Sequence, residues 1–151
     1  MPGFKQLAHV ALKVKSLDKS LDFYVNKLGL SEMMSLPKPD GSPGIWLVYL
    51  RITDDQYLEL FPDGVGTSAP DRDAVAINHI CLGVENLDET IAHMKNVGIP
   101  LTVQKKMAAD KNWQAWIEDP DGNRIELMQI MPDCLQLEAI ARMRKEAKAT
   151  A

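Results

Sequence analysis

The chain has little of three features that mark secreted, membrane-bound or nucleic-acid-binding proteins. Only two cysteines, Cys81 and Cys134, occur in 151 residues, so we expect no disulfide framework, and reduced thiols fit a cytoplasmic protein. No apolar run approaches the roughly 20 residues of a membrane span, and the first six residues lack the apolar segment of a secretory signal. Because 21 acidic residues outnumber 17 basic ones, neither nucleic acid nor an anionic membrane is an expected partner.

What the chain does contain is an internal repeat. The segment LAHVALKV around His9 returns as INHICLGV around His79, roughly 70 residues later, and YLELF around Glu59 returns as RIELM around Glu126. A repeat of this length is too long for a solenoid and suits a duplicated subdomain. Since 151 residues is the length of one ordinary domain, we expect the two copies to form a single body.

Each copy is predicted to fold as β-α-β-β-β. In the first copy, Ser16 or Asp18 would cap a helix that Gly29 ends, and Leu36–Gly44, with three prolines and two glycines, would be loop. In the second copy, helical spacing covers residues 87–97. Alternating or apolar segments predict strands at residues 6–14, 45–52, 56–61, 77–84, 101–105, 112–118 and 123–130.

The fold class we predict is α+β, with two tandem βαβββ modules forming a curved mixed sheet around a metal site. A final helix, which has Asp133 as its candidate N-cap, has no counterpart between the modules. The expected organisation of the single domain, 1–151, is module one at 5–62, a linker at 63–74, module two at 75–131 and the C-terminal helix at 133–149.

The metal site is predicted from the repeated His and Glu, which stand on strand faces opposite aliphatic neighbours. If the modules curl into a trough, all of these side chains face its floor. Two neutral imidazoles with two carboxylates suit a borderline divalent ion, whereas calcium and magnesium prefer oxygen ligands alone. We therefore expect one zinc, nickel, cobalt, manganese or ferrous ion, held by His9, Glu59, His79 and Glu126.

Two further residues beside this pattern are predicted to be structural. His93 lies in the helix of module two, has no equivalent in module one, and is expected to be a solvated helix residue. Cys81 shares the strand face of His79, but Ala11 fills the matching place in module one, so a small core-filling role is predicted for the cysteine.

The sequence indicates less clearly which residues would surround a substrate beside the metal site. Trp46, Trp113 and Trp116 lie in predicted strands, where core packing is the ordinary role, although Trp46, Trp116 or Gln114 could line a substrate pocket. Arg124 suits either a substrate carboxylate or phosphate, or a salt bridge at the rim.

Three motifs carry a family resemblance: LDxSxxFY from Leu17, LG at Leu28, and DPDGNRIEL from Asp119. With the paired modules, the chain resembles the vicinal oxygen chelate superfamily (glyoxalase, bleomycin resistance, dioxygenase) over residues 5 to 130, in its glyoxalase I branch. The resemblance implies the four metal ligands named above, with Glu126 also serving as general base; on chemical grounds Glu59 could take that role. It further implies a homodimer and a small substrate with vicinal oxygens.

The predicted activity is that of a lyase or isomerase of the lactoylglutathione lyase type, moving a proton through an enediolate on a small α-hydroxycarbonyl or related substrate. Glyoxalase I enzymes commonly bind glutathione through an Arg four residues after the first His and an Asn shortly after the first Glu. This chain has Lys13 and Asp63 there, so Lys13 is a candidate substrate-binding residue while glutathione itself is left open.

Two alternatives remain open at this point. An acyl-thioester epimerase would use the same base chemistry, although such relatives tend to have Gln where Glu59 stands. A metal-free binding protein of the bleomycin-resistance kind would need neither histidine. A ring-cleaving dioxygenase is disfavoured, because it would use two His and one Glu and leave the place of Glu59 without a ligand.

Overall fold

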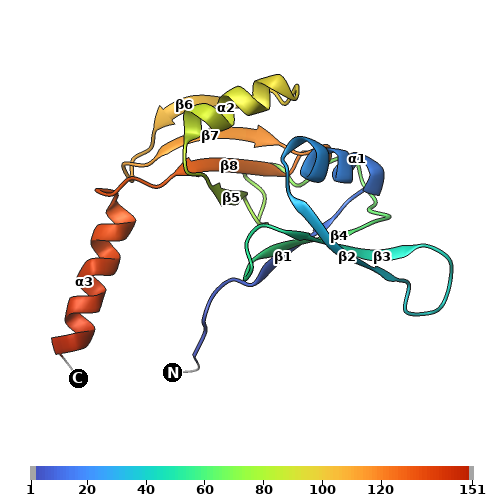
Figure 1. The fold of residues 1–151 in the computed structure, drawn as a ribbon, viewed down its shortest axis with the longest axis horizontal. Coiled ribbons are helices and arrows are strands. Elements are labelled where there is room, and N and C mark those ends of the chain that lie inside the picture. The colour runs from blue at the N-terminus through green and yellow to red at the C-terminus, as the bar shows by residue number, and fades with distance from the viewer. Residues whose placement is uncertain (1–2, 150–151) are drawn as a thin grey trace. The chain divides into compact units, whose positions relative to one another are not determined.

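The computed structural model describes residues 3–149, which divide into two compact units. Unit 1 runs up to Ala69 and also includes the turn Asp119–Gly122, whereas unit 2 comprises Pro70–Glu118 and the residues from Asn123 onward. Each unit contains one four-stranded mixed sheet (Figure 1). Among the described residues, no helix is both long enough and apolar enough to cross a membrane.

Unit 1 holds the first β-α-β-β-β module. Its strands pair in the order β1-β4-β3-β2, with β1 parallel to β4 and the other pairs antiparallel. The elements of this unit are β1 (His9–Lys13), α1 (Leu17–Leu21), the π-helix η1 (Asp22–Lys27), β2 (Ser31–Pro37), β3 (Ile45–Arg51) and β4 (Tyr57–Phe61).

The helical segment of unit 1 begins and ends where the sequence predicts. Ser16 is the N-cap, and its hydroxyl accepts the amide of Lys19. Past the last turn, Gly29 adopts φ +80, a left-handed conformation that glycine reaches without a Cβ clash. The widened turns of η1, where the amide of Leu28 donates to the carbonyl of Phe23, were not foreseen.

Unit 2 repeats the pattern. Its strands pair in the order β5-β8-β7-β6, with β5 parallel to β8. Figure 1 shows α2 lying across this sheet, where it contacts β7 and β8. The elements are β5 (Ile80–Gly83), α2 (Leu87–Asn96), β6 (Val103–Met107), β7 (Trp113–Glu118), β8 (Arg124–Gln129) and α3 (Leu135–Ala149). The predicted α+β fold, with paired βαβββ modules and a C-terminal helix, is therefore confirmed.

The core of each unit lies on the helix-covered face of its sheet. In β4, Leu58 and Leu60 are buried on either side of Glu59, and in β8, Ile125 and Leu127 are buried on either side of Glu126. Each fully buried side chain of this kind contributes roughly 1.5–3 kcal/mol of hydrophobic stabilisation. Since successive side chains alternate across a strand, these flanking residues force both carboxylates onto the opposite face.

The turn between β7 and β8 packs within unit 1. The hydroxyl of Tyr24 donates to Asp119 Oδ2 (2.9 Å), and the amide of Lys15 donates to Asp121 Oδ2 (3.0 Å). Burial, with Asp119 beside it, raises the pKa of Tyr24 far above its ordinary value, so the hydroxyl remains a donor. The Asp-Pro-Asp-Gly motif thus supplies buried acceptors to the helix of module one.

The last helix differs in detail from its prediction. Asp133 is not its N-cap, because α3 begins at Leu135 and the residue before it is Cys134, whose carbonyl accepts the amide of Glu138 (3.2 Å). The first turn is tied instead to the loop before β7, where Asn112 Nδ2 donates to Gln136 Oε1 (3.1 Å). No residue of α3 is buried.

Candidate metal centre

Strand register brings the first His and Glu together in unit 1. In the parallel pair β1–β4, His9 stands opposite Tyr57 and Ala11 opposite Glu59, which puts His9 Nε2 3.7 Å from Glu59 Oε2. Glu59 is only 8% exposed, and a buried carboxylate requires a partner. Tyr49 stands opposite it across the antiparallel pair β3–β4. Desolvation and the charge of Glu59 raise the pKa of Tyr49.

Unit 2 brings the second pair together in the same way. Cys81 of β5 stands opposite Glu126 of β8, and His79, two residues earlier, places its Nε2 3.2 Å from Glu126 Oε2. On the other side of β8, Trp116 stands opposite Glu126 and meets the His79 ring edge to face, with centroids 4.8 Å apart. The structure therefore joins the predicted ligands into two His–Glu pairs, one in each unit.

The spacing within the two pairs can be compared with that of two ligands on one divalent ion. Two ligands of one ion at about 2.1 Å from it, at bond angles near 90–120°, stand roughly 3.0–3.6 Å apart. The pair of unit 2 lies inside this range at 3.2 Å, and the pair of unit 1 lies just beyond it at 3.7 Å. Within residues 3–149, no group of three or more His, Cys, Asp and Glu side chains that could hold a metal occurs. Each unit thus holds one of the two His–Glu pairs.

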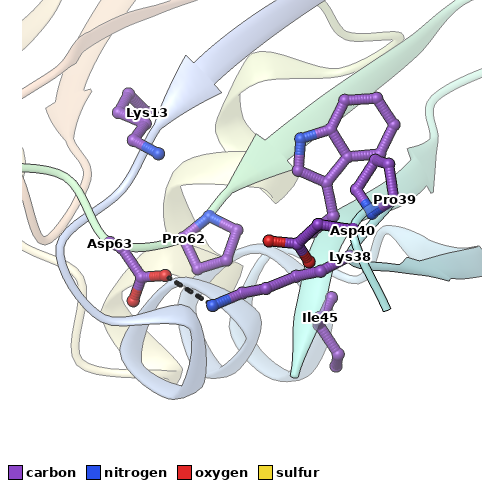
Figure 2. Close-up of a pocket in the computed structure, with 8 residues that line it drawn as sticks. Lys13, Lys38, Pro39, Asp40, Ile45, Pro62 and Asp63 are labelled. Atoms are coloured by element: carbon purple, nitrogen blue, oxygen red, sulfur yellow. Dashed lines mark ion pairs between the residues drawn. The ribbon is translucent and has the colours of Figure 1, made fainter. Parts of the chain in front are cut away.

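The candidate pocket residues fall into two groups. Lys13 and Trp46 line a pocket of about 270 Å³ in unit 1, and Figure 2 shows Lys13 across from the ion pair of Lys38 with Asp63, whose Nζ and Oδ2 are 3.8 Å apart. Trp46 is 41% exposed and meets Phe61 edge to face. Hence the two residues that replace the Arg and Asn of the glyoxalase I pattern, Lys13 and Asp63, line one pocket.

The other group surrounds His79 in unit 2. The guanidinium of Arg124 lies over the Trp116 ring, 4.5 Å from its centroid, and the indole N–H of Trp116 donates to Gln114 Oε1. Arg124 donates a hydrogen bond to Asn78 Oδ1; its contact with a substrate anion stays a prediction.

Cys81 does not fill the core, contrary to the prediction. It is exposed, and it lies on the same face as Glu126. Desolvation and the neighbouring Glu126 raise the pKa of its thiol to about 12, so the group is a neutral thiol at physiological pH. The prediction was wrong because a small residue such as Ala11 fits on either face of a strand, so the matching position in module one does not show whether Cys81 is buried. His93, by contrast, is exposed on α2 as predicted.

The tryptophans also differ from the core-packing prediction, since none of the three belongs to the buried core. Sequence reasoning missed three further residues at the pairs: Tyr49, Tyr57 and Asn78. Strand parity could have found both tyrosines, because each alternates onto the face of Glu59. Tyr57 stacks on the His9 ring at 5.4 Å. Asn78 carried no signal beyond its place next to His79.

Comparison with known proteins shows the family of the chain. A family model described as the glyoxalase/bleomycin resistance protein/dioxygenase superfamily matches residues 6–127. The chain is 32% identical over 125 residues to a probable lactoylglutathione lyase of Synechocystis, covering 82% of this chain and 94% of that protein. It is 33% identical over 126 residues to a lactoylglutathione lyase of Neisseria meningitidis, covering 82% and 90%.

Among solved structures, the trypanothione-dependent glyoxalase I of Leishmania major superimposes with a TM-score of 0.67 and 26% identity, over 98% of this chain and 100% of that one. The family match spans most of the chain and includes all four His and Glu residues. This chain is a member of the glyoxalase/bleomycin resistance protein/dioxygenase superfamily.

Proposed function

We propose that the protein is a divalent-metal-dependent lyase or isomerase of the glyoxalase I type. Its relatives named lactoylglutathione lyase support an enzyme of this superfamily. The observation that carries the proposal is the geometry of the two pairs, in which an imidazole Nε2 faces a carboxylate Oε2 at 3.7 Å and again at 3.2 Å. A site for ligand binding without metal would not need this pairing, and it would not need it twice.

The metal ligands in this proposal are His9, Glu59, His79 and Glu126. Zinc, nickel, cobalt, manganese and ferrous iron all accept such a mixed nitrogen and oxygen set. When bound, the ion polarises a substrate carbonyl and stabilises the negative charge of an enediolate. A homodimer, as the family resemblance implies, and a cytoplasmic location, as the reduced thiols suggest, belong to the same proposal.

Proton transfer falls to a carboxylate of these pairs. Glu126 lies on β8 between two buried residues, which fixes its backbone, while its side chain reaches the open face beside His79. The side chains of Glu59 and Glu126 are almost equally enclosed, at 11% and 13% exposed. Following the resemblance to glyoxalase I, we assign the base to Glu126, which takes the α-proton from one carbon and returns it to the neighbouring carbon. Glu59 serves chiefly as a ligand.

The substrate is a small α-hydroxycarbonyl or a related compound with vicinal oxygens. The residues proposed to contact it are Lys13, Trp46, Gln114, Trp116 and Arg124. At the pocket of unit 1, Lys13 offers a single ammonium where an Arg would offer a planar fork, and Asp63 opposes a second carboxylate. A substrate with one anionic group therefore fits this pocket better than the glutathione tripeptide.

The test is exchange of substrate protons with solvent. Candidate α-hydroxycarbonyls and the glutathione thiohemiacetal of a 2-oxoaldehyde are incubated with metal-loaded protein in D₂O, and deuterium at the α-carbon is followed by NMR. We expect exchange that is lost in Glu126→Gln and kept in Glu32→Gln, an exposed carboxylate on edge strand β2. Ligand binding without exchange in any candidate would overturn the enzyme proposal in favour of a binding protein.

A further inference from the structure

Asn78 ties the His79 ring to its surroundings through one side-chain amide. Its Oδ1 lies 3.0 Å from His79 Nδ1 and also accepts a hydrogen bond from Arg124 Nη1 at 2.9 Å. Its Nδ2 donates to the carbonyl of Arg72 at 2.9 Å. All of these residues lie in unit 2.

These contacts fix which atom of the amide is oxygen. A guanidinium can only donate and a backbone carbonyl can only accept, so the atom facing Arg124 must be Oδ1 and the atom facing Arg72 must be Nδ2. Because Oδ1 is an acceptor only, His79 Nδ1 has to donate to it. A neutral imidazole with this bond carries its proton on Nδ1 and its lone pair on Nε2, where a metal ion can bind. Without an ion, Nε2 faces a second acceptor, Glu126 Oε2, at 3.2 Å, and a proton on Nε2 as well makes that contact a hydrogen bond.

The partner of Asn78 is itself held in place. Arg124 stacks over Trp116 at 4.5 Å, and Trp116 in turn packs its ring against His79 at 4.8 Å. A stacked guanidinium loses little further freedom when it donates a hydrogen bond. The His79 imidazole is therefore held by the hydrogen bond at Nδ1 and by the ring of Trp116, while Nε2 is left for a metal ion.

Module one has no such arrangement. In the repeat, Ala8 occupies the place of Asn78, and a methyl group accepts no hydrogen bond. The His9 ring stacks on Tyr57 with an interplanar angle of 21°, which restrains its tilt but does not select a tautomer. Between residues 3 and 149, no hydrogen-bond partner is found for His9 Nδ1. The distance from Nε2 to Oε2 is also longer in the His9–Glu59 pair, which lacks the amide partner, than in the His79–Glu126 pair, at 3.7 Å against 3.2 Å.

We propose that Asn78, supported by Arg124, is a positioning residue that holds His79 in the Nδ1–H tautomer with Nε2 directed at the metal. The inference rests on the proposed function, in which His79 is a metal ligand. Partners that orient a ligating histidine in this way typically change metal affinity or activity by about 10–100-fold when they are removed.

The first experiment needs no metal and no substrate. The chain has only three histidines, so long-range ¹H–¹⁵N spectra of apo protein can report which ring nitrogens of each carry a proton. We expect a proton on Nδ1 of His79 in the parent protein and in Asn78→Asp, which keeps an acceptor oxygen, and a shift toward Nε2–H in Asn78→Ala. His9 in the same sample is the internal control.

The second experiment measures metal binding. Zinc affinity, determined by competition with a chromophoric chelator, should fall about 10–100-fold in Asn78→Ala and recover in Asn78→Asp. The matched control is Asn26→Ala, which removes an exposed asparagine bonded to Asp22 in unit 1, and which should leave zinc affinity and the His79 tautomer unchanged. Circular dichroism verifies that each variant is folded.

The outcomes separate this inference from the proposed function. An Nε2–H tautomer for His79 in the parent protein, or an unchanged tautomer in Asn78→Ala, overturns the positioning role whether or not metal binds. Protein that binds no zinc although His79 is Nδ1–H contradicts the metal site and leaves the orienting contact standing. Equal zinc affinity in the parent and in Asn78→Ala contradicts a role in metal binding.

Discussion

The two modules present the same His–Glu pair on equivalent strands, but they hold the histidine differently. In module two, His79 is hydrogen-bonded at Nδ1 and braced by an indole edge. In module one, His9 has only the stacked ring of Tyr57. Duplication therefore reproduced the backbone that positions the donors, while the contacts around each donor diverged. If both pairs serve one ion, module two provides the more rigid half of the ligand set.

The largest effect is expected on catalysis, where the carboxylates of Glu126 and Glu59 should differ. With metal at saturation, Glu126→Gln should lower kcat/KM for the deuterium-exchanging substrate by about 10²–10⁴-fold, the range typical of a missing general base. Glu59→Gln should cost less than Glu126→Gln under the same conditions, because Glu59 is assigned as a ligand and the metal is at saturation. Steady-state kinetics on both variants would contradict this assignment if Glu59→Gln were the more damaging change.

A second prediction concerns one matched position in the helices of the two modules. The repeat aligns Tyr24 with Met94, and both are buried. Tyr24→Phe leaves the buried Asp119 without its hydroxyl donor, so the free energy of unfolding should fall by about 1–3 kcal/mol. Urea denaturation provides the measurement. An unchanged unfolding midpoint would mean that the turn Asp119–Gly122 does not stabilise unit 1.

A third prediction is a gain in module one. Ala8→Asn places an amide where module two has Asn78, and should shift His9 toward the Nδ1–H tautomer with up to about 10-fold tighter zinc binding, the low end for an outer partner. The measurements are the same ¹⁵N spectra and chelator competition. Tyr57 stands where module two has Arg124, so a His9 tautomer that does not respond would show that the Arg is needed as well as the amide.

The smallest effect is expected at α3, which has no counterpart in module one. Hydrogen bonds from Gln136, and then from Asn112, lower the pKa of Asp110 below its ordinary 3.8. A carboxyl with a lowered folded-state pKa stabilises the fold above about pH 4 and loses that contribution as pH falls through the folded-state value. The protection of the amides in the first turn of α3, measured as exchange relative to the intrinsic rate at each pH, should therefore fall below about pH 4. In Asp110→Asn this pH dependence should disappear; its persistence would assign the effect to another group.

Much of this structure follows from the sequence because strand parity is a strong constraint. Buried Leu58 and Leu60 dictate where Glu59 points, and Ile125 and Leu127 do the same for Glu126, so the repeat and its alternation predict the fold and the faces of the ligands. Register then determines which strands meet, and here the parallel pairs β1–β4 and β5–β8 bring each His to its Glu.

The sequence does not predict contacts that depend on rotamers or on a neighbour far along the chain. The contact between Asn78 and Arg124 joins residues 46 positions apart, and neither residue type by itself implies the other. Cys81 was misplaced because a small residue fits either face of a strand. The π-helix η1 depends on backbone hydrogen bonds that residue spacing does not encode.

The metal content of the purified protein tests the proposed site most directly. Protein purified without chelator, analysed by inductively coupled plasma mass spectrometry, should contain one divalent ion per set of two His–Glu pairs. That metal should be lost in His9→Ala and in His79→Ala, and it should be retained in His93→Ala, which removes the histidine outside the pairs. Native parent protein that is metal-free, and that takes up no zinc, nickel, cobalt, manganese or ferrous iron on titration, would contradict the central claim that the paired His and Glu residues form a metal site.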